Sequence, residues 1–329
     1  MIKLLNALCV IFASLVATSA FAVNCQRAAT PLENTICHSE NLSWLNNIMA
    51  TYYRDTLARR EGYPVHQEYL AWQKSLQTCS SESCIERAYY AGIGKLAEAP
   101  AQFIWQGRWW NTLAANMNGG VIEFSHNADW TVNVDIRIWS GLNKEAYTGE
   151  ARKIDGMLLI NNMAGSKRCK VLLIPESSGA LQVFSSGKKG CSLSMPSGAF
   201  IDGIYERSEN DPRPEATLLS LQILPDAKTD QQFRALVGKD YQKFIQTANA
   251  YIYHQDIDNI GATVILSWLR GAANTRTAII MYNASDIWAA RIAPDEKGKL
   301  TFYYYSTQNS DISKMPRTIA QWRMRYMEQ

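Results

Sequence analysis

Residues 25–37, CQRAATPLENTIC, decide the fold of the first part of the chain. A cysteine stands at each end, and six of the seven cysteines in the sequence remain when Cys9, which lies in an apolar leader, is set aside. An even number of cysteines in an exported chain indicates disulfide bonds. Among the connectivities that these cysteines allow, proximity in sequence favours three local bridges: Cys25 with Cys37, Cys79 with Cys84, and Cys169 with Cys191.

The N-terminus has the pattern of a secretory signal peptide. Lys3 supplies a positive charge, an apolar run follows from residue 4 to 18, and Ala20-Phe21-Ala22 is a small-residue cleavage site. The apolar run is shorter than the roughly 20 residues of a membrane-spanning helix, and no later stretch approaches that length. Asn24 directly before Cys25 does not fit a lipid attachment site. We therefore expect residues 1–22 to be removed after Ala22, and the mature protein to be periplasmic or secreted with no membrane span.

Downstream of Cys37 the pattern is helical up to Pro100. Apolar residues recur three and four positions apart in the first predicted helix, at Leu42, Leu45, Ile48, Met49, Tyr52 and Tyr53. Gly62-Tyr63-Pro64 separates it from a second helix, and a third begins near Cys84. These three short helices, with a disulfide at either end, predict that residues 23–100 form a disulfide-stapled helical hairpin whose bridges compensate for a small core.

The rest of the chain predicts two further domains. From 104 to 207 the pattern changes to strand-like alternation with glycine-containing turns, which favours an antiparallel β-barrel or sandwich. Residues 208–214 lack apolar side chains and predict a linker. Residues 215–329 open with a helical pattern from Phe233 to Ala248 and continue with strand-like runs and a short terminal helix, which predicts an α+β domain. The fold class that follows is multidomain α+β.

The helical segment also carries a spaced motif in two halves. The first half is a cysteine, Ala-x-Thr-x-x-Glu and Ile-Cys, met by Cys25, Ala28, Thr30, Glu33, Ile36 and Cys37 and continued by Leu42, Leu45 and Tyr52. The second half is a tryptophan, a cysteine pair, a tyrosine, an isoleucine and a leucine, met by Trp72, Cys79, Cys84, Tyr89, Ile93 and Leu96. In this pattern the segment resembles the N-terminal domain of LprI-type lysozyme inhibitors. The resemblance implies a small helical fold and a lysozyme as partner.

The sequence departs from that family at three polar positions. Asn46 stands where an aspartate is usual, and Leu76 and Gly92 stand where arginines are common. Because residues that determine a fold do not carry function by themselves, the resemblance implies the fold more directly than the inhibitory activity. The C-terminal domain is weakly similar in layout to the Ivy group of lysozyme inhibitors, but it lacks that group's cysteine-bracketed, histidine-containing loop. The middle domain looks loosely like small secreted β-barrels.

Composition and motifs argue against catalysis, metal binding and nucleic-acid binding. The net charge of +3 creates no strong field for nucleic acid. No C-x-x-C occurs and the four histidines are scattered, so we expect no metal and no other cofactor. The loop at 185–190 lacks P-loop spacing, and the loop that begins at Asp256 has Ser267 where a calcium loop needs an acidic residue. Glu33 could act as a catalytic acid, but a hydrogen bond at a helix start or in the core explains it equally well. We expect a binding protein, not an enzyme.

Cationic and amide side chains in predicted turns are the candidate binding residues: Lys188, Lys189, Arg270, Asn274 and Arg276. A glycosidase cleft presents paired carboxylates, so a cationic side chain inserted there would find a charge partner. The sequence thus predicts a secreted periplasmic protein that binds and inhibits a lysozyme or another peptidoglycan-active enzyme. The alternative is a non-catalytic envelope adaptor or structural interaction protein. An enzyme that acts on cell-wall material has no motif behind it.

Overall fold

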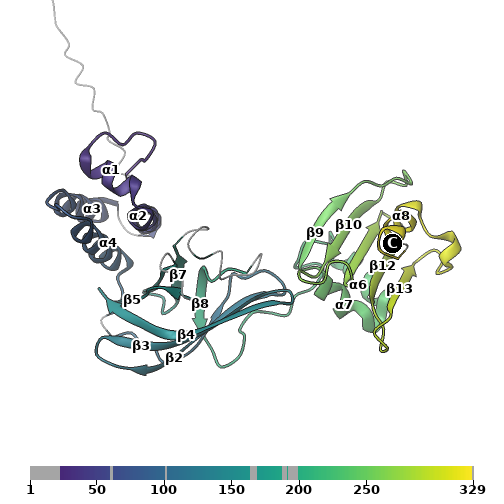
Figure 1. The fold of residues 1–329 in the computed structure, drawn as a ribbon. Helices are drawn as coiled ribbons and strands as arrows, with labels where there is room; N and C mark the ends of the chain where they lie inside the picture. Colours follow the sequence, from purple (N-terminus) through teal and green to yellow (C-terminus); the bar gives the residue numbers. More distant parts are fainter. Residues whose placement is uncertain are drawn as a thin grey trace, which may run out of the picture. The chain divides into compact units, whose positions relative to one another are not determined.

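The structure, a computed structural model, describes residues 23–59, 62–100, 102–163, 169–186, 191 and 199–327. The chain divides into two compact units, one up to Leu96 and the other from Ala97 onwards. The first unit is helical, and the second contains a β-barrel followed by an α+β domain (Figure 1). The predicted multidomain α+β fold is therefore confirmed. No helix within the described residues is long and apolar enough to cross a membrane.

The helical unit has one more helix than the sequence pattern predicts. The additional helix, α1, lies inside the loop that the Cys25–Cys37 disulfide closes. The hydroxyl of Thr30 accepts a hydrogen bond from the backbone N–H of Glu33, and the Glu33 carboxylate accepts one from the N–H of Thr30. This capping box, together with Pro31 at the first helical position, starts α1. The four helices are α1 (Pro31–His38), α2 (Glu40–Arg59), α3 (Gly62–Gln77) and α4 (Glu82–Ala97), and the Cys79–Cys84 disulfide closes the turn between the last two.

A row of aromatic rings lies at the centre of the helical unit. Tyr53 stacks on Tyr69 with 4.1 Å between ring centroids, and Trp72 lies 5.2 Å from both Tyr69 and Tyr89. The indole N–H of Trp72 donates to a backbone carbonyl of α4 at 2.8 Å. This close approach requires Gly92, because a Cβ at that position would lie 2.4 Å from Cδ1 of Trp72. Ring packing thus explains the glycine at one of the three departures from the family pattern.

Eight antiparallel strands close into a barrel, with β1 paired to β8. This closure decides between the barrel and the sandwich that the sequence left open. Trp109, Phe124 and Tyr205 are the largest fully buried side chains of its core, which also contains the disulfide-bonded Cys169 and Cys191. The strands are β1 (Gly107–Asn111), β2 (Asn118–Asn127), β3 (Thr131–Ser140), β4 (Asn143–Ile154), β5 (Met157–Ile160), β6 (Val171–Pro175), β7 (Leu181–Ser185) and β8 (Gly203–Arg207).

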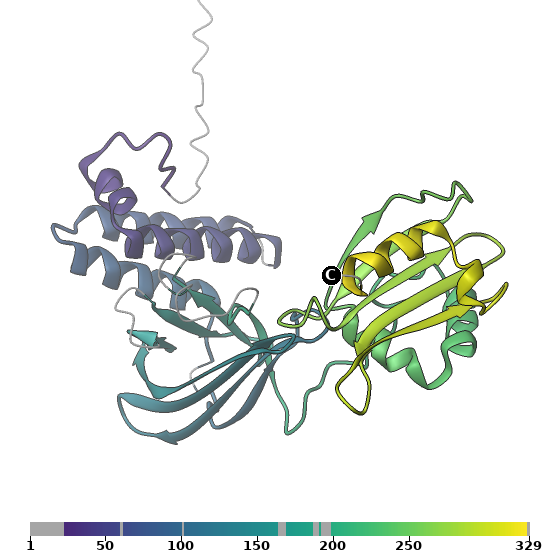
Figure 2. The same cartoon turned by 45° about the vertical axis from the view of Figure 1, so that its right-hand side comes forward.

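The α+β domain is built in three layers around a five-stranded sheet of order β13-β12-β11-β10-β9 (Figure 2). Ile265 belongs to the core under α6 and α7, and its neighbour Leu266 belongs to the core under α8, so the central strands are buried on both faces. The elements are α6 (Ala227–Val237), η2 (Gly238–Asp240), α7 (Tyr241–Thr247), β9 (Ala250–His254), β10 (Thr263–Trp268), β11 (Thr277–Tyr282), β12 (Ile287–Pro294), β13 (Leu300–Ser306), η3 (Ile312–Lys314) and α8 (Arg317–Met327).

Two features of this domain differ from the sequence prediction. The single helical pattern from Phe233 to Ala248 is divided into α6 and α7, because Gly238 takes a φ of +53° and a 3-10 turn follows. Strand β9 is absent from the prediction. Most of its residues are exposed and it lies at the edge of the sheet, so its sequence shows no alternation between a buried and an exposed face.

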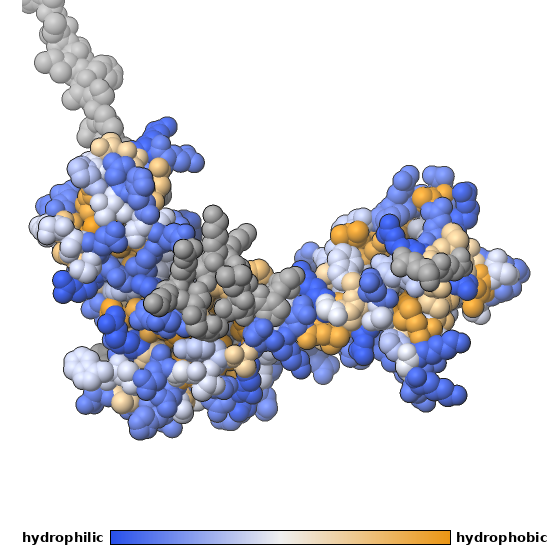
Figure 3. All heavy atoms as spheres, in the orientation of Figure 1, coloured by the Kyte–Doolittle hydropathy of each residue, from blue (hydrophilic) through white to orange (hydrophobic). Residues whose placement is uncertain are grey.

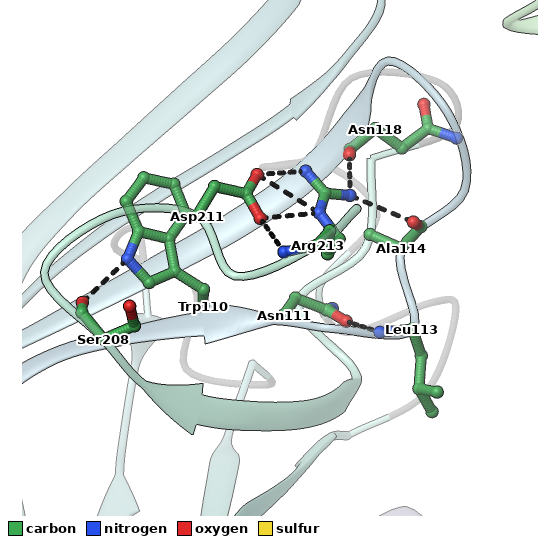
Figure 4. Close-up of polar contacts among 8 residues, drawn as sticks. All are labelled: Trp110, Asn111, Leu113, Ala114, Asn118, Ser208, Asp211 and Arg213. Atoms are coloured by element: carbon green, nitrogen blue, oxygen red, sulfur yellow. Dashed lines mark hydrogen bonds and ion pairs between the residues drawn. The ribbon is translucent and has the colours of Figure 1, made fainter. Parts of the chain in front are cut away.

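Residues 208–213, which belong to the predicted linker, are hydrogen-bonded to the barrel (Figure 4). The carbonyl oxygen of Ser208 accepts from the indole N–H of Trp110 at 3.0 Å. Arg213 forms a bidentate pair with Asp211 and donates to two backbone carbonyls around the β1–β2 connection at 3.0 and 2.7 Å. Polar contacts therefore order a segment that has no apolar side chain to bury.

We predict that Gly92→Ala destabilises the helical unit by about 1–3 kcal/mol, because the added methyl group would overlap Trp72 and Met49 in a packed core. Amide hydrogen exchange of α3 and α4 in the full chain measures the effect. Lys95→Ala, an exposed change on the same helix, is the matched control and should alter stability by less than about 0.5 kcal/mol. Equal protection in the G92A protein and the wild type would show that the rings can move aside without cost.

Candidate functional site

The structure describes three of the five candidate binding residues from the sequence. Lys188 and Lys189 lie outside the described residues. Arg270, Asn274 and Arg276 all lie on the connection between β10 and β11. We therefore consider that connection separately, together with the cavities of each unit.

Arg270 has a structural role. Its backbone N–H donates to the side chain of Asn249, and its carbonyl oxygen accepts from the N–H of Leu142. Its guanidinium donates to the hydroxyl of Ser140 at 3.3 Å. Asn274 is exposed in the turn, whereas Arg276 lines a cavity. Of the three, Arg276 is therefore the residue best placed to meet a ligand.

The cavity beside Arg276, called the basic cavity here, has a volume of about 370 Å³. At its base the guanidinium of Arg291 pairs with Asp240, with 3.0 Å from Nε to Oδ2, and stacks on the ring of Tyr303 at 3.7 Å. Tyr305 also donates to this carboxylate. Lys239, Lys243, Arg276 and Arg291 supply the cationic groups of the cavity, and Asp240, Asp295 and Glu296 supply the carboxylates.

Burial by itself would raise the pKa of Asp240. Hydrogen bonds from Tyr305, Lys243 and Arg291 outweigh burial and lower this pKa to about 2. The carboxylate is therefore charged at neutral pH and neutralises the buried arginine. Lys239 and Arg276 line the same cavity, so the arrangement suits an acidic side chain or a carboxylate of a partner.

A second cavity, the helical groove, has a volume of about 750 Å³ and lies within the helical unit. It runs between the start of α1 and the α3–α4 turn, so the two disulfides hold both of its walls. Leu32, Leu76 and Ile85 supply its apolar surface, and Glu33 and Glu82 are the charged side chains among its lining residues. Such a groove is complementary to a partner segment with basic and apolar side chains.

Glu33 acts as part of a helix cap in this structure. Backbone N–H groups of Ala29 and Thr30 donate to its carboxylate at 2.8 and 2.9 Å and lower its pKa. A catalytic acid in a glycosidase needs the opposite, a raised pKa that keeps the proton available. The geometry thus favours the helix-start interpretation of Glu33.

Asn46, another departure from the family pattern, is buried and bonded through both atoms of its amide. Its Oδ1 accepts from the N–H of Val23 at 2.9 Å and from the hydroxyl of Tyr89 at 3.0 Å, while its Nδ2 donates to the carbonyl oxygen of Val23 at 3.0 Å. An ionised aspartate has no hydrogen to donate to that carbonyl. The third departure, Leu76, forms part of the apolar lining of the helical groove.

The described ranges contain no group of three or more His, Cys, Asp or Glu side chains close enough to hold a metal ion.

Comparison with known proteins gives one kind of match. The chain is 24% identical over 86 residues to lipoprotein LprI of Mycobacterium bovis and to lipoprotein LprI of Mycobacterium tuberculosis. The chain is similar to LprI. The aligned stretch covers 25% of this chain and 44% of each relative, so the chain spans less than half the length of these curated relatives. No family model and no solved structure matches the chain. The disulfide-bonded helices fit the LprI likeness.

We predict that Asp240→Asn lowers the stability of the α+β domain by about 3–5 kcal/mol at neutral pH, because Arg291 would remain buried without a charge partner. In the wild type the pKa of Asp240 is lower in the folded state than in the unfolded state. Its contribution of about 2 kcal/mol is therefore present above pH 4 and is lost as the pH falls toward 2.

Urea unfolding from pH 2 to pH 7 measures both effects. The D240N protein should lose less stability than the wild type between pH 4 and pH 2, and the exposed control Glu296→Gln should follow the wild type throughout. Wild-type stability of D240N at pH 7 would contradict the role of the buried pair.

Proposed function

We propose that this protein is secreted into the periplasm and inhibits a lysozyme or another peptidoglycan-active enzyme by binding to it. The observation that carries the proposal is the LprI likeness together with a helical unit that two disulfides hold. Disulfides of this kind belong to an oxidising compartment, where such an enzyme would be met. Because the likeness covers a quarter of the chain, the activity of the whole protein is part of the proposal.

The helical groove is the contact surface that we assign to the partner enzyme. Leu32 is half-buried over the buried Leu76 and Ile85 and would be covered on binding, and the carboxylates of Glu33 and Glu82 would pair with basic side chains of the partner. Bound in this way, the protein would obstruct access of peptidoglycan to the enzyme.

The β10–β11 connection offers a second contact of opposite charge. Arg276 is exposed at the end of this connection, beside the basic cavity. A glycosidase presents paired carboxylates at its cleft, and a guanidinium pairs well with a carboxylate. Lys188 and Lys189 stay candidates for the same role on the basis of the sequence.

The test is the rate of cell-wall lysis by chicken-type, goose-type and invertebrate-type lysozymes with and without an excess of the oxidised protein from Val23 to Gln329. We predict inhibition of at least one class. Gln77→Trp, which fills the helical groove, should raise the half-inhibitory concentration about tenfold or more. Lys74→Trp places the same side chain at an exposed position of α3 outside the groove and should change this concentration less than about twofold.

The Q77W and K74W variants test whether the partner enzyme binds at the helical groove or elsewhere on the surface. Equal inhibition by the Q77W and K74W proteins would exclude the helical groove as the contact surface. If Arg276→Ala and the double change of Lys188 and Lys189 to alanine also leave inhibition intact, the cationic side chains are not the second contact. A folded wild-type sample that inhibits none of the three classes would overturn the proposal and favour the non-catalytic envelope adaptor.

A further inference from the structure

A hollow lies on the outer face of the barrel, where the strand register places small residues between large ones. Trp110 pairs with Val121 across β1 and β2, Val121 pairs with Arg137 on β3, and Arg137 pairs with Ala146 on β4. Side chains in one such row point to the same side of a sheet. In the next row Gly119 pairs with Trp139, which pairs with Lys144. Valine and alanine therefore form the floor of a groove whose walls are two tryptophans and an arginine, and Gly119 makes room for the indole of Trp139.

Both tryptophans are held in position without a ligand. The indole of Trp139 lies across Gly119, where a Cβ would be 2.0 Å from the ring atom Cζ2. The indole N–H of Trp110 donates to the carbonyl oxygen of Ser208, as Figure 4 shows. The two rings meet edge to face, with 6.5 Å between their centroids. Because the rings are already oriented, a ligand would not have to order them on binding.

The cavity that these residues line has a volume of about 670 Å³ and an apolar interior with polar groups at its rim. Arg137 is fixed by ion pairs to Glu123 at 3.2 Å and to Asp135 at 3.0 Å. Lys144 lies at the rim and is exposed, whereas Glu145 pairs with the core residue Ile138 and so points to the other face of the sheet. An apolar surface with a few hydrogen-bonding groups is the usual composition of a small-molecule site.

From this geometry we infer that the groove binds a saccharide. A pyranose ring has C–H groups on its faces and hydroxyl groups around its edge. Its face would pack on one of the indoles of Trp110 and Trp139, whose rings lie at 79° to each other, and its edge would hydrogen-bond to the donors of Arg137 and Lys144. Glu123 and Asp135 balance the charge of Arg137 beside the groove, so an uncharged sugar with polar edges is complementary to it.

The architecture disfavours an extended peptide as the ligand. Peptides that bind to sheets add a strand to a free edge and rely on backbone hydrogen bonds. The barrel is closed through the pairing of β1 with β8, and the groove lies on the faces of β1–β4, which each have a neighbour on both sides. The groove therefore offers side chains, and not a free strand edge, to its ligand.

The experiment titrates the full mature chain with tri-N-acetylchitotriose, cellotriose and maltotriose, and follows the indole N–H signals by NMR. We expect saturable shifts of the Trp110 and Trp139 signals with at least one of these sugars. Trp139→Ala should weaken binding about tenfold or more. Trp130→Ala is the matched control, because Trp130 is 79% exposed at the β2–β3 turn outside the groove, and its loss should change the affinity less than about twofold.

Ala146→Phe keeps the inference testable if loss of Trp139 disturbs the barrel. Ala146 is exposed on β4, so a phenylalanine fits the strand but would occupy the groove, and it should also abolish the shifts. Lack of any saturable shift with the three sugars, or an equal loss of affinity in W139A and W130A, would overturn the inference. Neither result of the sugar titration bears on lysozyme inhibition, which is measured separately.

Discussion

Closure of the barrel through the pairing of β1 with β8 is the constraint on which most of the second unit depends. It joins Trp109 to Arg207, residues almost a hundred positions apart, and leaves no free edge among the eight strands. It also determines which residues point inward, so that Trp109 enters the core while Trp110 points outward. Since β8 leads directly into residues 208–213, closure brings that polar segment against Trp110 and the β1–β2 connection.

The helical unit depends instead on the packing of its aromatic rings and on its two disulfides. Its three departures from the LprI pattern are explained by neighbouring groups: Gly92 makes room for Trp72, Asn46 binds the backbone of Val23, and Leu76 lines the groove. The disulfides act at the two walls of that groove, where they limit the conformations of the unfolded chain. The same bridges thus stabilise a small core and shape the surface that we assign to a partner.

The three cavities described above differ in the charge of their lining residues, so we expect them to bind ligands of different chemistry. Acidic and apolar groups line the helical groove, whereas cationic groups and carboxylates together line the basic cavity around the neutralised pair of Asp240 and Arg291. The barrel groove combines two indoles with a rim of mixed charge. Exposed hydrophobic residues elsewhere lie in small separate patches between hydrophilic ones on the face of the α+β domain seen in Figure 3. A single chain can therefore present distinct contact surfaces for ligands of different chemistry.

The sequence by itself determined most of the helices and strands and the local disulfide partners, because these features depend on residues close together in the chain. Periodicity predicted α2 and the alternation of β3, and cysteine spacing predicted the bridges. Only the tertiary structure decided closure of the barrel, the edge strand β9 and the pairing of Asp240 with Arg291. Barrel closure and the Asp240–Arg291 pair join groups far apart in the sequence, and β9 lacks a buried face. No local sequence pattern therefore indicates them. The alternation in β1 and β3 is enough to place Trp110 and Trp139 on the outer face of the barrel. That the two rings contact each other follows only from the register between the strands.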